Sequence, residues 1–211
     1  MNTPIQTPIQ ALPLFPLGTV LFPGGILPLQ IFEVRYLDLV RRCLREGSPF
    51  GIISLLEGHE VRKPAEQVSL ARFGTLVHVD ECEALSPALL RIRCKASQRF
   101  ELLDAEQQQG GLWVGRVRVL DTEPDIALPD DLASAGRRLG ELLESLEEQN
   151  VAAEQWPFDK PYKLTDCAWV ANRWCEILPM NKDTKLQMLA LDNPLIRLEL
   201  VNDVLIEQGL V

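Results

Sequence analysis

Two charged residues stand where a proline-rich apolar stretch meets an amphipathic segment. Glu33 and Arg35 lie in "IFEVRY" (31–36), and the apolar stretch before them contains Phe15 and Phe22. An arginine can hold a carboxylate or a carbonyl through its N–H donors, and aromatic side chains can line an apolar groove. In the alternative interpretation, Glu33 is a first-turn acid favoured by a helix dipole, Arg35 packs or forms an ion pair, and Phe15, Phe22 and Phe32 belong to the core.

A second set of charged residues alternates with apolar ones. Arg91, Arg93 and Lys95 take alternate positions in "LLRIRCK" (89–95), and Arg116 and Arg118 do so in "GRVRV" (115–119). Alternate side chains of a strand point to the same face, so pairing of the two segments would place five cations on one sheet face. Such a face could bind an anionic partner, either an acidic peptide or RNA, or it could be a solvated outer surface.

Sequence patterns for other common chemistry are missing. The chain has no GxxxxGK[ST], HExxH or GxSxG string. Its two histidines, His59 and His78, are isolated, and its five cysteines are scattered without a CxxC pair. We therefore expect no cofactor, no metal site and no enzymatic activity, and we interpret the cysteines as reduced thiols of a cytoplasmic protein.

The net charge disfavours general nucleic-acid binding. The 211 residues contain 21 Lys and Arg against 30 Asp and Glu, a net charge of −9. Phosphate contacts require cations that replace the counterions of the nucleic acid. Only residues 88–120 carry an excess of Lys and Arg, so RNA binding would have to use this block.

The apolar stretch 12–36 does not fit a membrane span or a secretory signal. A transmembrane helix needs about 20 uninterrupted apolar residues, whereas prolines stand at positions 13, 16, 23 and 28. No basic residue precedes Arg35, so the basic region of a signal peptide is missing. We expect this stretch to belong to a folded core.

The elements that must position these residues change character near residue 121. Before it, short apolar runs bounded by Gly, Pro and Ser predict strands at 50–56, 75–85, 89–109 and 110–121, the last two as a hairpin across a glycine turn. One helix interrupts them: apolar residues in "FEVRYLDLVRRCLREG" (32–47), including Phe32 and Leu44, recur every three or four positions, and Gly47 suits its end.

After a connector rich in Pro and Asp (121–131), the apolar period becomes helical. Helices are predicted at 132–146, 165–178, 182–191 and 193–209, with Thr165 or Asp166 and then Asn193 as N-caps and Pro194 in a first turn. Trp156, Trp169 and Trp174 of this half are expected in the core or at a subunit contact. The sequence thus predicts an α+β chain with a β-rich half at 10–121 and an all-helical half at 122–211.

The string "LPLFPLGTVLFPGGILPLQIFEVRY" (12–36) resembles the opening of the N-terminal, substrate-binding domain of the ATP-dependent protease Lon. In the same order, "FGII" (50–53) resembles the family's next strand, "FGT" (73–75) its Gly-Thr turn, "RIRCKASQRF" (91–100) a strand ending in an Arg-Phe pair, and "PLIRLELV" (194–201) its helical tail with Arg197 and Leu198. The resemblance implies a PUA-like β-barrel followed by a helical bundle. The ATPase and peptidase modules are not matched, so we expect a stand-alone domain without peptidase activity.

The resemblance further implies a non-catalytic module that recognises unfolded or exposed apolar protein segments, as an adaptor in protein quality control with a protease or chaperone as partner. Its expected peptide-binding residues are Phe15, Phe22, Glu33, Arg35 and Tyr36. One alternative is an RNA-binding PUA-like protein that uses Arg91, Arg93, Lys95, Arg116 and Arg118. Two others are a small-molecule sensor with a pocket in the barrel and a structural homo-oligomer.

Overall fold

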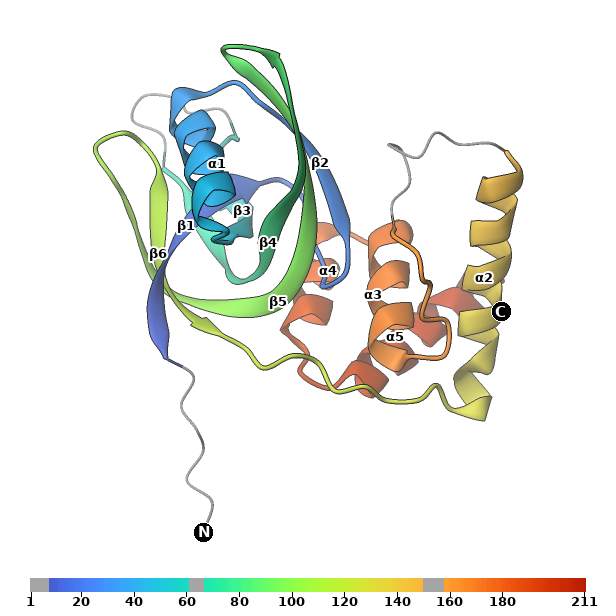
Figure 1. Ribbon diagram of the computed structural model, residues 1–211. Coiled ribbons are helices and arrows are strands. Elements are labelled where there is room, and N and C mark those ends of the chain that lie inside the picture. Colours follow the sequence, from blue (N-terminus) through green and yellow to red (C-terminus); the bar gives the residue numbers. More distant parts are fainter. Residues whose placement is uncertain (1–7, 61–66, 150–157) are drawn as a thin grey trace. The chain divides into compact units, whose positions relative to one another are not determined.

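The computed structural model describes residues 8–60, 67–149 and 158–211 (Figure 1). The chain forms two compact units, Met1–Pro23 with Leu27–Thr122, and Gly24–Ile26 with Glu123–Val211. We call the first the barrel unit, because it holds the sheet and one helix, and the second the helical unit. The α+β class predicted from the sequence is confirmed.

Six strands and one helix make up the sheet region. Their order along the chain is β1 (Ile9–Leu17), β2 (Ile26–Ile31), α1 (Val34–Glu46), β3 (Phe50–Glu57), β4 (Ser69–Ser86), β5 (Leu89–Gln107) and β6 (Trp113–Val119). The strand order in the sheet is β2-β5-β4-β3-β1-β6, and β6 also pairs with β5. This second pairing closes five of the strands into a barrel, with β2 added beside β5.

The barrel can close because β5 is long enough to serve several neighbours. Its first part pairs with β4 as far as Glu101, and its last part, from Phe100 to Gln107, pairs with β6. The predicted hairpin between these two strands is confirmed, and its turn contains Gly111 with φ of 82°. Only glycine adopts this backbone conformation without strain.

The barrel interior is filled by a phenylalanine that lies against two glycines. A Cβ atom on Gly74 would lie 2.4 Å from Cζ of Phe100 and 2.5 Å from the carbonyl oxygen of Ile52. Gly51 faces the same ring, with a built Cβ only 2.8 Å from Cε1 of Phe100. The expectation of a turn at 73–75 was wrong, because these residues lie inside β4, where glycine makes room for the ring.

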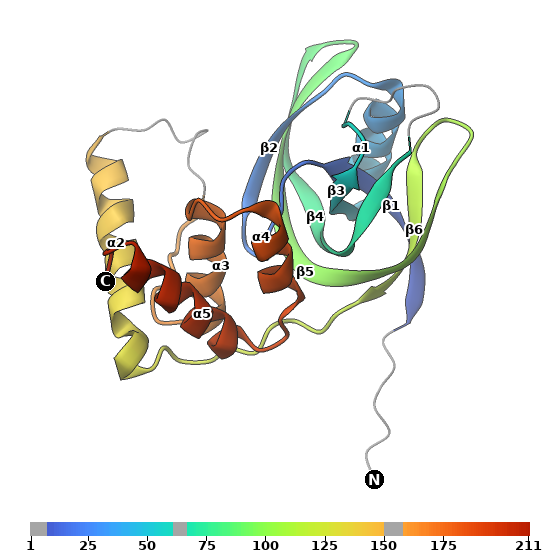
Figure 2. The ribbon, with the colours of Figure 1, turned by 180° about the vertical axis from the view of Figure 1, so that it is seen from behind.

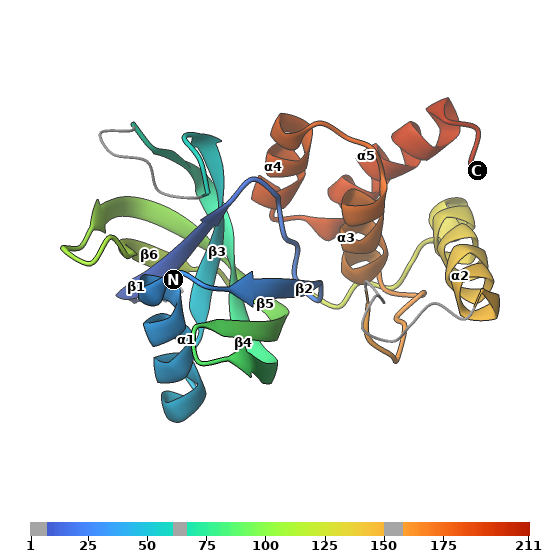
Figure 3. The same ribbon diagram turned by 90° about the horizontal axis from the view of Figure 1, so that it is seen from above.

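Helix α1 packs against the barrel through one apolar face (Figure 3). Its start and its end at Gly47, which has φ of 63°, agree with the sequence prediction. Two residues of the predicted apolar stripe point elsewhere, because Phe32 is 58% exposed and Leu44 is 47% exposed. Leu37 is buried on the packing face instead.

The helical unit contains a short 3₁₀ turn, η1 (Asp130–Leu132), and four helices. They are α2 (Ala133–Glu148), α3 (Cys167–Ile177), α4 (Lys182–Ala190) and α5 (Pro194–Glu207). In all three ribbon views α3 lies between α2 and α4 (Figure 2). The predicted caps Asp166 and Asn193 accept hydrogen bonds from the backbone N–H groups of Trp169 and Leu195.

Arginine side chains lie inside this helical unit. Arg197 has no solvent exposure, and it donates to the carbonyl oxygens of Met188 and Leu191 and to Oδ1 of Asn172. It also forms an ion pair with Glu123 at 2.5 Å. The network connects the connector, α3, α4 and α5 within one unit. Trp174 is buried, Trp169 is partly buried, and Trp156 lies outside the described residues.

Among the described residues, no helix has the length and apolar character that crossing a membrane requires.

Candidate functional site

The first turn of α1 brings together the charged pair found in the sequence. Glu33 is the N-cap residue, but its side chain makes no capping hydrogen bond. Instead, its Oε2 lies 2.8 Å from Nη2 of Arg35. Nη1 of Arg35 donates to the carbonyl oxygen of Gly111 over 2.7 Å. Arg35 therefore fixes the beginning of α1 to the turn between β5 and β6.

The Arg35 guanidinium packs on a stack of two aromatic rings. The Arg35 guanidinium lies 4.5 Å from the centre of the Tyr36 ring, a cation–π distance. The Tyr36 ring in turn stacks on Phe15 with centroids 3.9 Å apart. Burial raises the pKa of the Tyr36 hydroxyl to about 12, so Tyr36 stays neutral across the physiological range. The side chain of Arg35 is only 8% exposed.

The structure places the aromatic members of the predicted peptide-binding set in the core. Phe15, Phe22 and Tyr36 are 8%, 0% and 4% exposed. A ring buried to this extent packs against its neighbours and has little surface for a bound segment. Within the barrel unit, Phe15 and Tyr36 instead position Arg35.

Two apolar side chains beside them are exposed. Phe32 precedes the N-cap and is 58% exposed, and Val34 at the first helical position is 72% exposed. We call this pair the α1 apolar pair. Phe32 was expected in the core, because its position continues the apolar spacing of the predicted helix. The apolar spacing could not reveal that Phe32 is exposed. Phe32 fits the helical spacing by position, but it lies before the N-cap and outside α1.

The five cations predicted to share one face are distributed by the strand register over two pairings. Arg91 and Arg93 lie opposite Glu83 and Glu81 of β4, and Lys95 lies opposite His78. Arg116 and Arg118 of β6 lie opposite Asp104 and Glu101, in the last part of β5. The register of β5 shifts between these two parts, so β5 does not carry one uninterrupted face.

Carboxylates neutralise three of these arginines. Arg91 pairs with Glu83 at 3.1 Å and Arg93 with Asp80 at 2.6 Å. Arg118 contacts Glu101 at 2.7 Å, and the same carboxylate also receives Arg72 at 2.6 Å. A strip whose cations are already paired has less unbalanced charge to offer a phosphate backbone. These contacts do not favour RNA binding.

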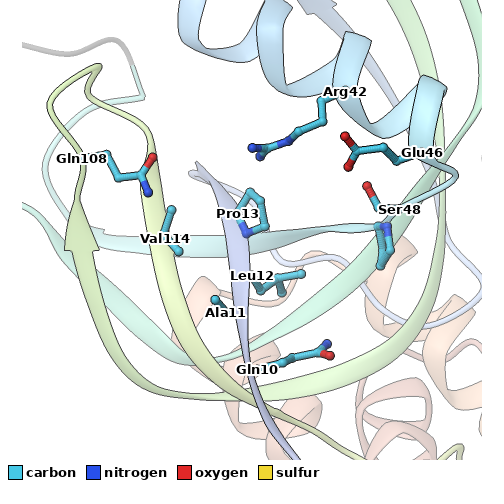
Figure 4. Close-up of a pocket in the computed structure, with 10 residues that line it drawn as sticks. Gln10, Ala11, Leu12, Pro13, Arg42, Glu46, Ser48, Gln108 and Val114 are labelled. Atoms are coloured by element: carbon cyan, nitrogen blue, oxygen red, sulfur yellow. The ribbon is translucent and has the colours of Figure 1, made fainter.

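The barrel unit also carries a pocket of about 420 Å³ (Figure 4). Its floor is β1 from Gln10 to Pro13, and Val114 of β6 and Gln108 lie on one side. Arg42 and Glu46 of α1, followed by Ser48 and Pro49, form the other side. Its volume lies in the range typical of small-ligand sites. None of the predicted peptide-binding or anion-binding residues lines it.

The described residues contain no group of three or more metal-ligating side chains. All five cysteines are free thiols, and four of them are buried. Burial raises the pKa of Cys94 and of Cys175 to about 12, which keeps both in the unreactive thiol form.

Solved structures with similar folds cover nearly the whole chain. A crystal structure of a Lon N-terminal domain protein from Xanthomonas campestris has a TM-score of 0.71 and 30% sequence identity, over 92% of this chain and 98% of that one. The N-terminal domain of the Lon protease from the Mycobacterium avium complex has a TM-score of 0.57 over 92% of this chain and 97% of that one. At 15% identity, the second likeness shows the fold alone.

Among curated proteins, the chain is similar to protein cereblon. It is 26% identical to cereblon of Danio rerio over 130 residues, which is 60% of this chain and 28% of that protein. It is 24% identical to cereblon of Gallus gallus over 164 residues, or 76% of this chain and 32% of that protein. The chain therefore spans about a third or less of these curated relatives.

The family described as the ATP-dependent protease La (LON) substrate-binding domain matches residues 11–207. The match includes both units, from the strand that carries Phe15 to the helix that carries Arg197. The chain belongs to this family of Lon substrate-binding domains.

Proposed function

We propose that this substrate-binding module recognises exposed apolar segments of other proteins, with the α1 apolar pair, Phe32 and Val34, as its contact surface. The observation that carries the proposal is the exposure of these two side chains on a helix start that Arg35 holds in place. An exposed apolar side chain on a rigid support loses little conformational freedom when a partner covers it. The family's substrate-binding character supports a protein ligand.

In this proposal Glu33, Arg35, Phe15 and Tyr36 are positioning residues. They keep the first turn of α1 and the β5–β6 turn in one arrangement, and the contact itself falls to Phe32 and Val34. The module acts without chemistry of its own, as a quality-control adaptor that holds an unfolded segment for a protease or a chaperone.

The test measures, by fluorescence anisotropy, how tightly the whole chain binds a protein that reduction and carboxymethylation keep permanently unfolded. The double variant Phe32→Ser/Val34→Ser should weaken binding at least about tenfold, since burying one such side chain contributes about 1.5–3 kcal/mol. Hydrogen exchange of the wild type with this client should show protection over residues 29–36.

The helical unit offers a matched control. Ile196 and Leu200 of α5 are 45% and 42% exposed, so Ile196→Ser/Leu200→Ser removes a comparable amount of apolar surface. The control should bind the client as the wild type does. An equal or larger loss in the control would move the contact surface to α5 and overturn the proposal.

A further inference from the structure

The pocket on the barrel unit lies beside a part of β1 that has only one strand neighbour. β1 pairs with β6 from Ile9 to Leu14. Its parallel pairing with β3 begins only at Leu14, which lies opposite Gly51. From Gln10 to Pro13, the side of β1 away from β6 therefore has no strand partner within the described residues, and these four residues line the pocket.

An unpaired strand edge presents backbone N–H and C=O groups that an extended peptide can pair with. In an antiparallel pair, every second residue directs both groups away from its partner, so part of 10–13 must direct them away from β6. Four residues of strand extend about 13 Å, which fits a short segment rather than a long one. The edge is thus suited to a peptide of about four paired residues.

The pocket also has an unbalanced positive charge. Its carboxylate, Glu46, already pairs with Arg45 at 3.3 Å. Arg42 lines the pocket and makes no hydrogen bond or ion pair with any residue that the structure describes. Figure 4 shows its guanidinium directed over Pro13. A guanidinium in this position can take a carboxylate through two parallel hydrogen bonds.

We propose that this pocket binds the free C-terminus of an extended peptide, which pairs with β1 over 10–13 and places its terminal carboxylate on Arg42. The peptide lies beside residues 10–13 of β1, on the edge that β3 occupies from Leu14 onward, and it runs parallel to β1 as β3 does. It must stop where β3 begins, beside Pro13, so a chain end fits there and a continuing chain does not. Neither Pro13 nor Pro49 has an N–H to offer the carboxylate, which leaves that task to Arg42.

This inference goes beyond the proposed function, since it concerns a different surface and a different ligand chemistry. Arg42 lies two turns along α1 from Val34, about 12 Å at 1.5 Å per residue. The α1 apolar pair requires apolar side chains in its ligand, whether or not the segment includes a chain end. The pocket requires a free carboxyl terminus and tolerates varied side chains.

The test uses two pools of six-residue peptides of mixed sequence, one with free C-terminal carboxylates and one with C-terminal amides. They are added to the ¹⁵N-labelled whole chain, and the backbone amide signals are followed by NMR. The free-acid pool should shift the signals of Gln10, Ala11, Leu12 and Ser48. The amide pool should bind at least about tenfold more weakly, because a hydrogen-bonded charge pair contributes about 1.5–3 kcal/mol.

Arg42→Gln should weaken binding of the free-acid pool by the same factor. Arg41→Gln is the matched control, because the Arg41 guanidinium donates to the carbonyl oxygen of Pro87, outside the pocket. Equal binding of the two pools, unchanged binding by Arg42→Gln, or no shift over 10–12 at millimolar peptide would each overturn the proposal. So would equal shifts from acetate alone, which would indicate a site for small carboxylates. None of these results depends on Phe32 or Val34, so failure here and failure of the proposed function are distinguishable.

Discussion

Both units contain an arginine removed from solvent, but each unit uses it differently. In the barrel unit, Arg35 lies above the packed core on an aromatic stack and ties a helix start to a turn. In the helical unit, Arg197 of α5 takes the place of core side chains. Its partners are Asn172 of α3, two backbone carbonyl oxygens at the end of α4, and Glu123 in the connector.

The difference shows what each unit depends on. The barrel is held by strand pairing and by rings such as Phe100 that fill its interior, so removing Arg35 should loosen one surface. The helical unit depends on a buried polar network around Arg197, and a buried charge that loses its partner is costly. We therefore expect the barrel to be sensitive to added volume and the helical unit to lost charge.

The largest effect should follow Arg197→Met. This change removes the ion pair between Arg197 and the Glu123 carboxylate, whose side chain is 8% exposed. Loss of one partner of a buried pair costs about 3–5 kcal/mol. Hydrogen exchange should show faster opening across α3 and α5 with little change in the strands. The double variant Glu123→Gln/Arg197→Met should recover part of the loss, and equal destabilisation of both units would contradict the comparison.

Gly74→Ala is the matching test of the barrel. The added Cβ would meet the Phe100 ring and the Ile52 carbonyl oxygen, and the latter is backbone that cannot rotate away. Overpacking of this kind costs about 1–3 kcal/mol or more. Chemical denaturation should show the loss, with hydrogen exchange placing it in the strands. In Gly110→Ala the new Cβ meets nothing within 4 Å, so stability should be unchanged there; a comparable loss would refute the volume explanation.

The smallest effect concerns pH and the helical unit. Burial raises the pKa of the Asp166 carboxyl above 3.8, neighbouring Asp125 raises it further, and the N–H of Trp169 opposes the shift. The folded state therefore holds this proton at pH values where the unfolded state has released it. Stability from this group is present at low pH and is lost as pH rises from 3.8 through the folded-state pKa.

Asp125→Asn removes one of the causes of that shift. NMR titration of the Asp166 carboxyl should show a lower pKa in the variant, and thermal melts should show a weaker dependence on pH in the acidic range. An unchanged carboxyl titration would mean that Asp125 has no influence on this cap. The barrel strands serve as the internal reference, because neither residue belongs to that unit.

Much of the fold is local enough to be read from the sequence. The start of α1 near Val34, its stop at Gly47, the caps Asp166 and Asn193 and the glycine turn at 111 all follow from one residue's conformational preference or from spacing along one element. The closure of the barrel, the parallel pairing of β1 with β3 and the partner of Arg197 depend on residues far apart in the chain, and no single segment encodes them.

The site was predicted only in part, for a related reason. The sequence singled out Glu33, Arg35 and the aromatic residues, and the structure brings Phe15, Arg35 and Tyr36 together. It could not separate the buried rings from the exposed Phe32, because both kinds of residue occur in one apolar run. The pocket at Arg42 depends on where β3 begins relative to β1, which is a matter of tertiary register.

The pairing of β1 with β6 has a consequence for the newborn chain. These strands lie at opposite ends of the barrel unit's sequence, yet Ile9 pairs with Arg118. At about 5–20 residues per second of synthesis, roughly 5–20 s pass between the synthesis of β1 and that of β6. For that time the edge of β1 that later pairs with β6 is open to pairing with other nascent chains. Pro13 and Pro16 remove two of its donors, and so protect it until the barrel can close.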